Sequence, residues 1–242
     1  MRDVPWSGTG SDGADTKALV VEGLDVSYGD AKVLFGVSLR VEEGQLVACV
    51  GRNGAGKTTL LRTIAGFLRP SAGRIRYGDV DLVGWKPYEI ARLGIRYVQQ
   101  DKRVFSDLTV RENLELASYA TGDRNWDIVF HYFPKLKELL DRKGGYLSGG
   151  ERQMLMIGRA LLGNPKVLLI DEPTEGLAPS IVELLRDVFR ELKKSSSVVI
   201  VEQNLPLVAD VADKVYAVKE GRIAAEISDA QAIKGHAYEQ YL

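Results

Sequence analysis

The chain has 242 residues, of which 45% are hydrophobic and 27% are charged, and its formal net charge is -1. This composition is typical of a globular protein with a sizeable core, and the near-neutral charge gives no indication of a nucleic acid as partner. The single cysteine excludes an intrachain disulfide, and no segment approaches the roughly 18 apolar residues that span a bilayer. We therefore expect a cytoplasmic protein that contacts a membrane only through partners.

The N-terminal part of the chain is predicted to contain a tail followed by three strands. Residues 1–16 have no apolar core and are rich in Gly, Asp and Ser, which favours a flexible tail over a signal peptide. Residues 19–28 are apolar and β-prone. Residues 33–41 carry apolar side chains at the odd-numbered positions, which predicts a half-buried strand, antiparallel to its neighbour. Residues 46–50 are apolar throughout, as in a strand covered on both faces.

After a helix-like segment at 59–65, strands and helices alternate along the chain. The predicted elements are a hairpin at 74–82, a strand at 94–98, helical structure from 108 to about 141, buried strands at 167–170 and 197–201, an amphipathic helix at 181–194 and a closing hairpin at 215–227. The pattern predicts an α/β fold with an antiparallel β element near the start and a mostly helical insertion at about 85–160. No internal repeat is visible, so we expect one such module.

A glycine-rich segment separates the buried strand at 46–50 from the helix at 59–65. It has the pattern G-x-x-x-x-G-K-[ST], and its residues are Gly51, Arg52, Asn53, Gly54, Ala55, Gly56, Lys57 and Thr58, followed by Thr59. Glycines let several backbone N–H groups point at one anion, and the start of a helix adds a partial positive charge. Lys57 can reach the β- and γ-phosphates of a nucleotide, and the Thr58 hydroxyl can ligate Mg²⁺. A glycine-rich turn without a ligand is the weaker interpretation, because strand and helix flank it as a phosphate site requires.

Two carboxylates end the predicted strand at 167–170. Consecutive strand residues point to opposite faces, so Asp171 and Glu172 are free to take different roles. We assign Asp171 to Mg²⁺ and Glu172 to the activation of an attacking water as general base. Alone, such a pair of carboxylates fits the start of a solvated loop equally well. In a chain that also has a phosphate loop, the pair indicates a nucleotide-hydrolysing site.

A third motif precedes the apolar helical segment that begins near residue 149. Ser148 and Glu151 have the spacing of a capping box, which an ordinary capped helix would explain. Gly149 and Gly150 are costly inside a helix, at roughly 1 kcal/mol each. We therefore expect something to approach the backbone closely there, and a phosphate at this second helix start would account for both glycines.

Together these motifs resemble those of the ATP-binding subunits of ABC transporters, over the chain from about residue 18 onward. Residues 51–58 match the Walker A motif, residues 147–153 the LSGGQ-type signature and residues 168–172 the Walker B motif. The resemblance implies a P-loop NTPase core over 17–242, with an antiparallel β subdomain and a helical subdomain. It further implies that Tyr28 stacks on adenine and that Gln100 senses Mg²⁺ and the γ-phosphate. The alternatives are that Tyr28 packs on the core and that Gln100 is a surface residue.

The resemblance also implies partners and a cycle. In this family two nucleotide-binding domains pair head to tail, each ATP lies between the phosphate loop of one and the signature of the other, and hydrolysis drives membrane-spanning permease subunits. ATP and Mg²⁺ are therefore the expected cofactors, and the inner face of the cell membrane is the expected location. A soluble ABC ATPase that assists assembly, as in iron–sulfur cluster biogenesis, is the alternative function.

Two positions depart from the family pattern. Gln203 stands where a histidine usually contacts the γ-phosphate, and Ala178 stands where the D-loop aspartate is usual. Glutamine donates a hydrogen bond but carries no proton, so the catalytic competence of the site is open. The segments 175–179 and 201–204 resemble ATPases of branched-chain amino acid importers and related urea or amide importers. That subgroup implies a second, different ATPase subunit as partner, and self-pairing is the alternative.

Overall fold

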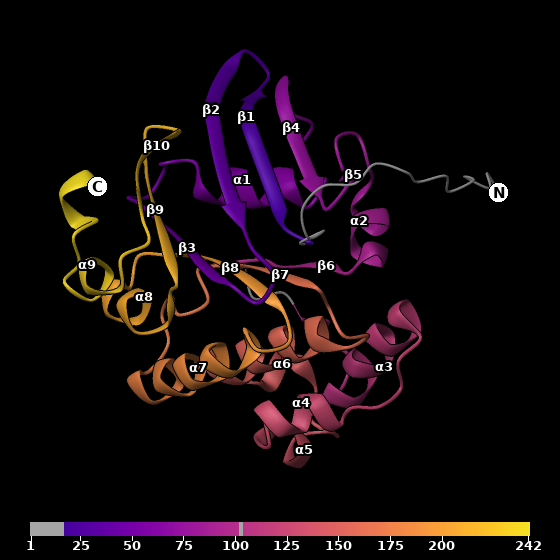
Figure 1. Cartoon of the computed structure of the whole chain (residues 1–242). Coiled ribbons are helices and arrows are strands. Elements are labelled where there is room, and N and C mark those ends of the chain that lie inside the picture. The colour runs from indigo at the N-terminus through magenta and orange to yellow at the C-terminus, as the bar shows by residue number, and fades with distance from the viewer. Residues whose placement is uncertain (1–16, 102–103) are drawn as a thin grey trace.

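The computed structural model describes residues 17–101 and 104–242, so the tail predicted for residues 1–16 lies outside the described residues. Two sheets lie above one another, with α1 (Lys57–Ile64) between them, and a layer of helices covers the free face of the larger sheet (Figure 1). These layers agree with the predicted α/β fold and its additional antiparallel β element.

The smaller sheet is antiparallel and four-stranded. Its order is β2 (Ala31–Val41), β1 (Leu19–Tyr28), β4 (Ala72–Tyr77) and β5 (Val80–Asp81), which confirms the two predicted N-terminal strands and the hairpin.

The alternation predicted for residues 33–41 is wrong at its start. Leu34 is fully buried, whereas Val33 and Phe35 are only half-buried. Leu34 pairs with Val26 and Val37 with Leu24, so β2 carries one extra residue between these pairs. Gly36 lies in this bulge with a φ of 64°, and the bulge exchanges the two faces of the strand.

The larger sheet is six-stranded and carries the site at one edge. Its order is β10 (Arg222–Ile227), β9 (Lys214–Lys219), β3 (Leu46–Val50), β8 (Ser197–Glu202), β7 (Val167–Asp171) and β6 (Ile95–Val98). All neighbours are parallel except β9 and β10, which form the predicted closing hairpin. Because parallel strands end at the same edge, the residues that follow β3, β8, β7 and β6 meet there.

The helices after β6 form a group below the larger sheet in Figure 1. They are α3 (Val110–Thr121), α4 (Asp127–Tyr132), α5 (Lys135–Glu138), the 3-10 turn Gly144–Tyr146 and α6 (Gly149–Leu161). The remaining helices are α2 (Pro87–Leu93), α7 (Pro179–Leu192), α8 (Leu205–Val211), α9 (Ala230–Lys234) and the turn Glu239–Tyr241. The predicted helical insertion at 85–160 thus contains α2 to α6, although β6 within it joins the central sheet. No described helix has the length and apolar character of a membrane span.

Strand β3 shows why the core has two halves. Leu46, Ala48 and Val50 face the layer of helices, whereas Val47 and Cys49 face α1 and the antiparallel sheet. All five side chains are fully buried, as predicted for a strand covered on both faces. Burial raises the pKa of the Cys49 thiol to about 12, against the opposing charge of Lys57, so this cysteine is an inert core residue.

Candidate active site

The glycine-rich loop of residues 51–58 connects the end of β3 to α1, as predicted. Gly54 and Gly56 have φ values of 81° and 101°, which favour glycine. A Cβ on Gly56 would also lie 2.7 Å from Cδ2 of Leu34. Gly56 precedes α1 as its N-cap and no side chain caps this helix start. The first N–H groups of α1 are therefore available to an anion, which fits a nucleotide phosphate.

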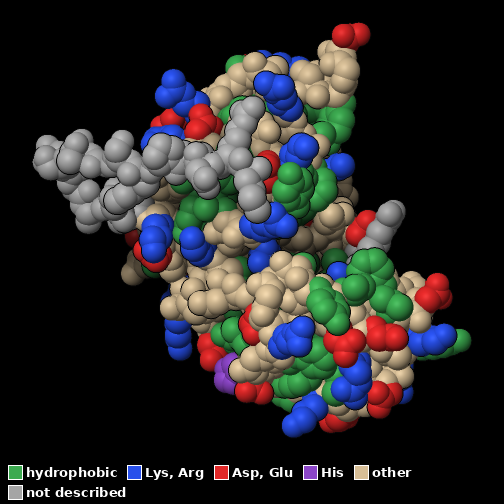
Figure 2. Space-filling view, turned by 90° about the vertical axis from the view of Figure 1, so that its right-hand side faces the viewer, with side chains coloured by type: hydrophobic (Ala, Val, Ile, Leu, Met, Phe, Trp, Pro, Cys, Tyr) green, Lys and Arg blue, Asp and Glu red, His purple; other side chains and the backbone are tan. Residues whose placement is uncertain are grey.

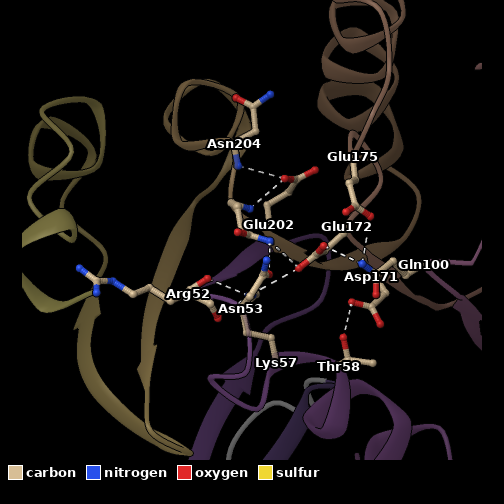
Figure 3. A network of polar contacts seen from close by, with 12 residues as sticks. Arg52, Asn53, Lys57, Thr58, Gln100, Asp171, Glu172, Glu175, Glu202 and Asn204 are labelled. Carbon is tan, nitrogen blue, oxygen red and sulfur yellow. Dashed lines mark hydrogen bonds and ion pairs between the residues drawn. The ribbon is translucent and has the colours of Figure 1, made fainter.

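Lys57 lies folded over the loop that it belongs to (Figure 3). Its Nζ donates to the carbonyl oxygens of Gly51, at 2.7 Å, and Arg52, at 3.1 Å. It also lies 3.5 Å from Oε1 of Glu172, and only 4% of the lysine side chain is exposed. A buried ammonium with one carboxylate and two carbonyl partners is poised to exchange them for phosphate oxygens.

Asp171 and Thr58 form the candidate metal site. The Thr58 hydroxyl donates to Oδ1 of Asp171 at 3.1 Å, and the Tyr97 hydroxyl donates to Oδ2 at 2.9 Å. Burial raises the pKa of Asp171, and the hydrogen bonds from Tyr97 and Thr58 oppose that rise. Hydroxyl and carboxylate oxygens suit Mg²⁺. The described residues contain no group of three or more His, Cys, Asp or Glu side chains that could hold a metal ion.

Glu172 does not point to the opposite face from Asp171, so the reason given for their separate roles is wrong. Strand β7 ends at Asp171, and Glu172 follows it with a φ of 44°. This turn brings both carboxylates to the phosphate loop. Oε2 of Glu172 accepts from Nε2 of Gln100 at 2.8 Å, and its Oε1 accepts from Nε2 of Gln203 at 2.9 Å. The same Gln100 nitrogen donates to Glu175 at 3.0 Å.

Gln203 connects the loop to this carboxylate. Its Nε2 donates to Oδ1 of Asn53 at 2.7 Å as well as to Glu172. Both amide hydrogens are therefore engaged, and the residue that replaces the usual histidine contacts both the phosphate loop and the Glu172 carboxylate.

Two supporting residues were missed by sequence reasoning: Tyr97 and Glu202. Glu202 is buried at the end of β8, where its Oε1 accepts from the Thr174 hydroxyl at 2.6 Å and its Oε2 from the backbone N–H of Gln203 at 2.9 Å. Burial raises the pKa of Glu202, against these hydrogen bonds. It fixes the turn that presents Gln203. The sequence signal that could have identified Glu202 is a carboxylate at the end of an apolar strand.

A pocket of about 420 Å³ brings eight of the predicted site residues together. Its lining residues are Val33, Asn53, Gly54, Gly56, Lys57, Thr58, Thr59, Gln100, Glu172 and Glu175. Arg52 and Ala55 line a neighbouring cavity of about 220 Å³ with Asn53, Gly54, Val218–Glu220 and Leu242. Tyr28 is outside the first pocket, at the end of β1, and 44% of it is exposed. Its ring is therefore accessible to a flat ligand.

The signature residues begin α6 and are not among the residues that line this pocket. The predicted capping box is present: Ser148 Oγ accepts from the Glu151 N–H at 3.2 Å, and Glu151 accepts from the Ser148 N–H at 2.8 Å. The expected close approach to the backbone is present at Gly150, where a Cβ would lie 2.9 Å from Cγ1 of Ile181 on α7, so a side chain of the same chain accounts for this glycine. Gly149 has no such neighbour, so its backbone stays open to a ligand.

The family assignment follows from this geometry and from comparison with known proteins. The family described as ABC transporter matches residues 34–175. The chain belongs to that family and is an ATPase of the ABC type.

The names of individual relatives are more specific than that of the family. The chain is 42% identical over 201 residues to the high-affinity branched-chain amino acid transport ATP-binding protein BraG of Pseudomonas aeruginosa, covering 81% of this chain and 86% of that protein. It is 35% identical to a probable branched-chain amino acid transport ATP-binding protein, LivF, of Archaeoglobus fulgidus, covering 83% and 88%. A nucleotide-free ATP-binding cassette from an ABC transporter superposes with a TM-score of 0.82 at 31% identity, covering 92% of this chain and 96% of that one.

Proposed function

We propose that this chain is the ATP-hydrolysing subunit of an importer of branched-chain or related amino acids. The observation that carries the proposal is the position of Glu172, whose carboxylate is reached by Lys57, Gln100 and Gln203 beside the phosphate loop. The relatives supply the substrate class, since their names assign them to branched-chain amino acid transport. They favour import over the assembly ATPase that the sequence left as the alternative.

In the proposed reaction, Lys57 and the N–H groups of residues 51–58 bind the phosphates, and Tyr28 stacks on the adenine. Mg²⁺, when bound, supplies charge neutralisation at the phosphates, and Thr58, Asp171 and Gln100 would hold it. Glu172 accepts a proton from the attacking water. Gln100 and Gln203 hold the two oxygens of Glu172, and so orient the base.

The site of one chain is completed by a second ATPase subunit. Ser148 to Glu151 lie outside the pocket of their own chain, yet Gly149 leaves a helix start open to an anion. We therefore infer a head-to-tail dimer in which this segment meets the nucleotide of its partner. A different ATPase subunit is the favoured partner because Gln203 replaces the histidine. The dimer acts with membrane-spanning permease subunits on the inner face of the cell membrane.

Replacement of Glu172 tests the proposal. We expect Glu172→Gln to keep ATP binding and to lower hydrolysis by about 10²–10⁴, the usual contribution of a general base. Glu183→Gln is the control, because Glu183 is exposed on α7 and does not line the pocket; this variant should retain most activity. Retention of most turnover by Glu172→Gln would refute the base assignment.

The same two variants test transport in cells of the source organism. Glu172→Gln should abolish uptake of radiolabelled leucine, whereas Glu183→Gln should keep it. Loss of labelled urea or acetamide uptake instead would change the substrate class. Purification of the Glu172→Gln protein with ATP from detergent-solubilised membranes should recover a polytopic membrane protein and a second ATPase; recovery of soluble partners alone would favour the assembly function.

A further inference from the structure

Tyr97 lies on β6, the strand next to β7, and makes a contact that none of the motifs predicts. Tyr97 pairs with Leu169 in the parallel ladder, and Asp171 follows Leu169 by two residues on the same face of β7. This diagonal placement lets the phenol cross between strands to the metal carboxylate. Its hydroxyl donates to Oδ2 of Asp171 at 2.9 Å.

Two hydroxyl groups divide the Asp171 carboxylate between them. Tyr97 donates to Oδ2 and Thr58 donates to Oδ1, so each carboxylate oxygen has one hydrogen-bond donor.

The ring of Tyr97 is held separately from its hydroxyl. It lies 5.9 Å from the ring of Phe67, at an interplanar angle of 59°. Both rings line a further cavity of about 570 Å³, distinct from the two described above, together with Met156 and Arg159 of α6. Phenylalanine at position 97 would keep these ring contacts, so the hydroxyl is removable without emptying the site.

We propose that Tyr97 is a positioning residue that fixes the orientation of the Asp171 carboxylate for Mg²⁺. Partners that orient a metal-binding carboxylate commonly contribute 10- to 100-fold to metal affinity. The inference rests on the proposed function in one respect, namely that Asp171 serves the metal of bound ATP.

The test separates metal binding from catalysis. In the non-hydrolysing Glu172→Gln background, the dissociation constant of radiolabelled ATP is measured by equilibrium dialysis, first in EDTA and then in saturating Mg²⁺. The constant in EDTA divided by the constant in Mg²⁺ reports how strongly Mg²⁺ binds the protein–ATP complex, relative to its binding to free ATP. We expect Tyr97→Phe to lower this ratio about tenfold and to leave the constant in EDTA unchanged.

Tyr238→Phe is the matched control. Tyr238 is fully buried, and its hydroxyl donates to the carbonyl of Leu205 at 3.2 Å, outside the site. Its removal should leave the ratio unchanged. An unchanged ratio in Tyr97→Phe, or an equal weakening of ATP in EDTA and in Mg²⁺, would overturn the positioning role and leave the proposed function intact. Failure of the Glu172→Gln parent itself to bind ATP would overturn both.

Discussion

Gln203 stands where ATP-binding cassettes usually carry a histidine, and its amide nitrogen uses both hydrogens within the site. It donates to Asn53 of the phosphate loop and to Glu172. An amide cannot take up the proton that a histidine can, so its contribution is confined to hydrogen bonding.

We expect Gln203→Ala to lower kcat by about 10-fold, the lower end of the range for loss of a hydrogen bond to a charged group. Steady-state hydrolysis by the purified chain measures this loss. Gln240→Ala is the control, since Gln240 is exposed and its side chain donates to the backbone of Ala237. Complete loss of turnover in Gln203→Ala would show that the glutamine does the histidine's work.

At the scale of single residues, local motifs predicted the position of the phosphate loop well. They did not predict contacts between residues that are far apart in the sequence. Glycine spacing located the phosphate loop, because the backbone there needs φ values of 81° and 101°. The Asn53–Gln203 contact joins residues 150 positions apart, and no local pattern encodes it. The neighbour of Gly150 was not predictable for the same reason: Ile181, which excludes a side chain there, belongs to another helix.

Helix starts differ in how well the sequence caps them. Thr109 caps α3 and accepts from the N–H of Glu112 at 3.2 Å. Ala178 occupies the corresponding position of α7 with extended backbone. Its carbonyl oxygen accepts from the N–H of Ile181 at 2.9 Å, but its side chain has no oxygen, so the first turn of α7 lacks a side-chain cap.

Replacing Ala178 by Asp should raise the free energy of unfolding by about 1 kcal/mol, because a carboxylate at this position adds a side-chain acceptor for the first turn of α7 and is attracted by the helix dipole. Urea denaturation followed by circular dichroism measures the change. Thr109→Ala is the comparison, because it removes an existing cap; its free energy of unfolding should fall by about 1 kcal/mol. A destabilised Ala178→Asp protein would contradict the capping argument.

The elements themselves were largely predictable, because their periodicities are local. Both sheets contain the strands that alternation and apolar runs indicated, and α7 follows its amphipathic pattern. The face of β2 was not predictable at Leu34, since the bulge at Gly36 exchanges the faces without changing the composition.

On the scale of the molecule, β3 is the centre of the fold. It lies between β8 and β9, and its residues contribute to both halves of the core. Cys49, the only cysteine of the chain, is fully buried there. The end of the same strand carries the phosphate loop, so ligand binding and exposure of Cys49 are linked.

We expect Cys49 to react with an aromatic disulfide reagent at pH 8 only after unfolding, because burial removes both access and thiolate character. ATP at 100 times its dissociation constant should slow the reaction about 100-fold, corresponding to about 2.7 kcal/mol. Absorbance of the released thiol measures the rate. Lys57→Ala should lose the protection by ATP, and rapid labelling of the native chain would contradict the burial.

The position of β3 also sets an order of events during synthesis. Asn53 leaves the ribosome 150 residues before Gln203, which at about 5–20 residues per second is a delay of roughly 8–30 s. Throughout that time an apolar strand with five core residues waits with both edges unpaired, because its neighbours β8 and β9 do not yet exist. The nascent chain is thus exposed to aggregation until β8 and β9 have been synthesised, and a chaperone would be of most use during this interval.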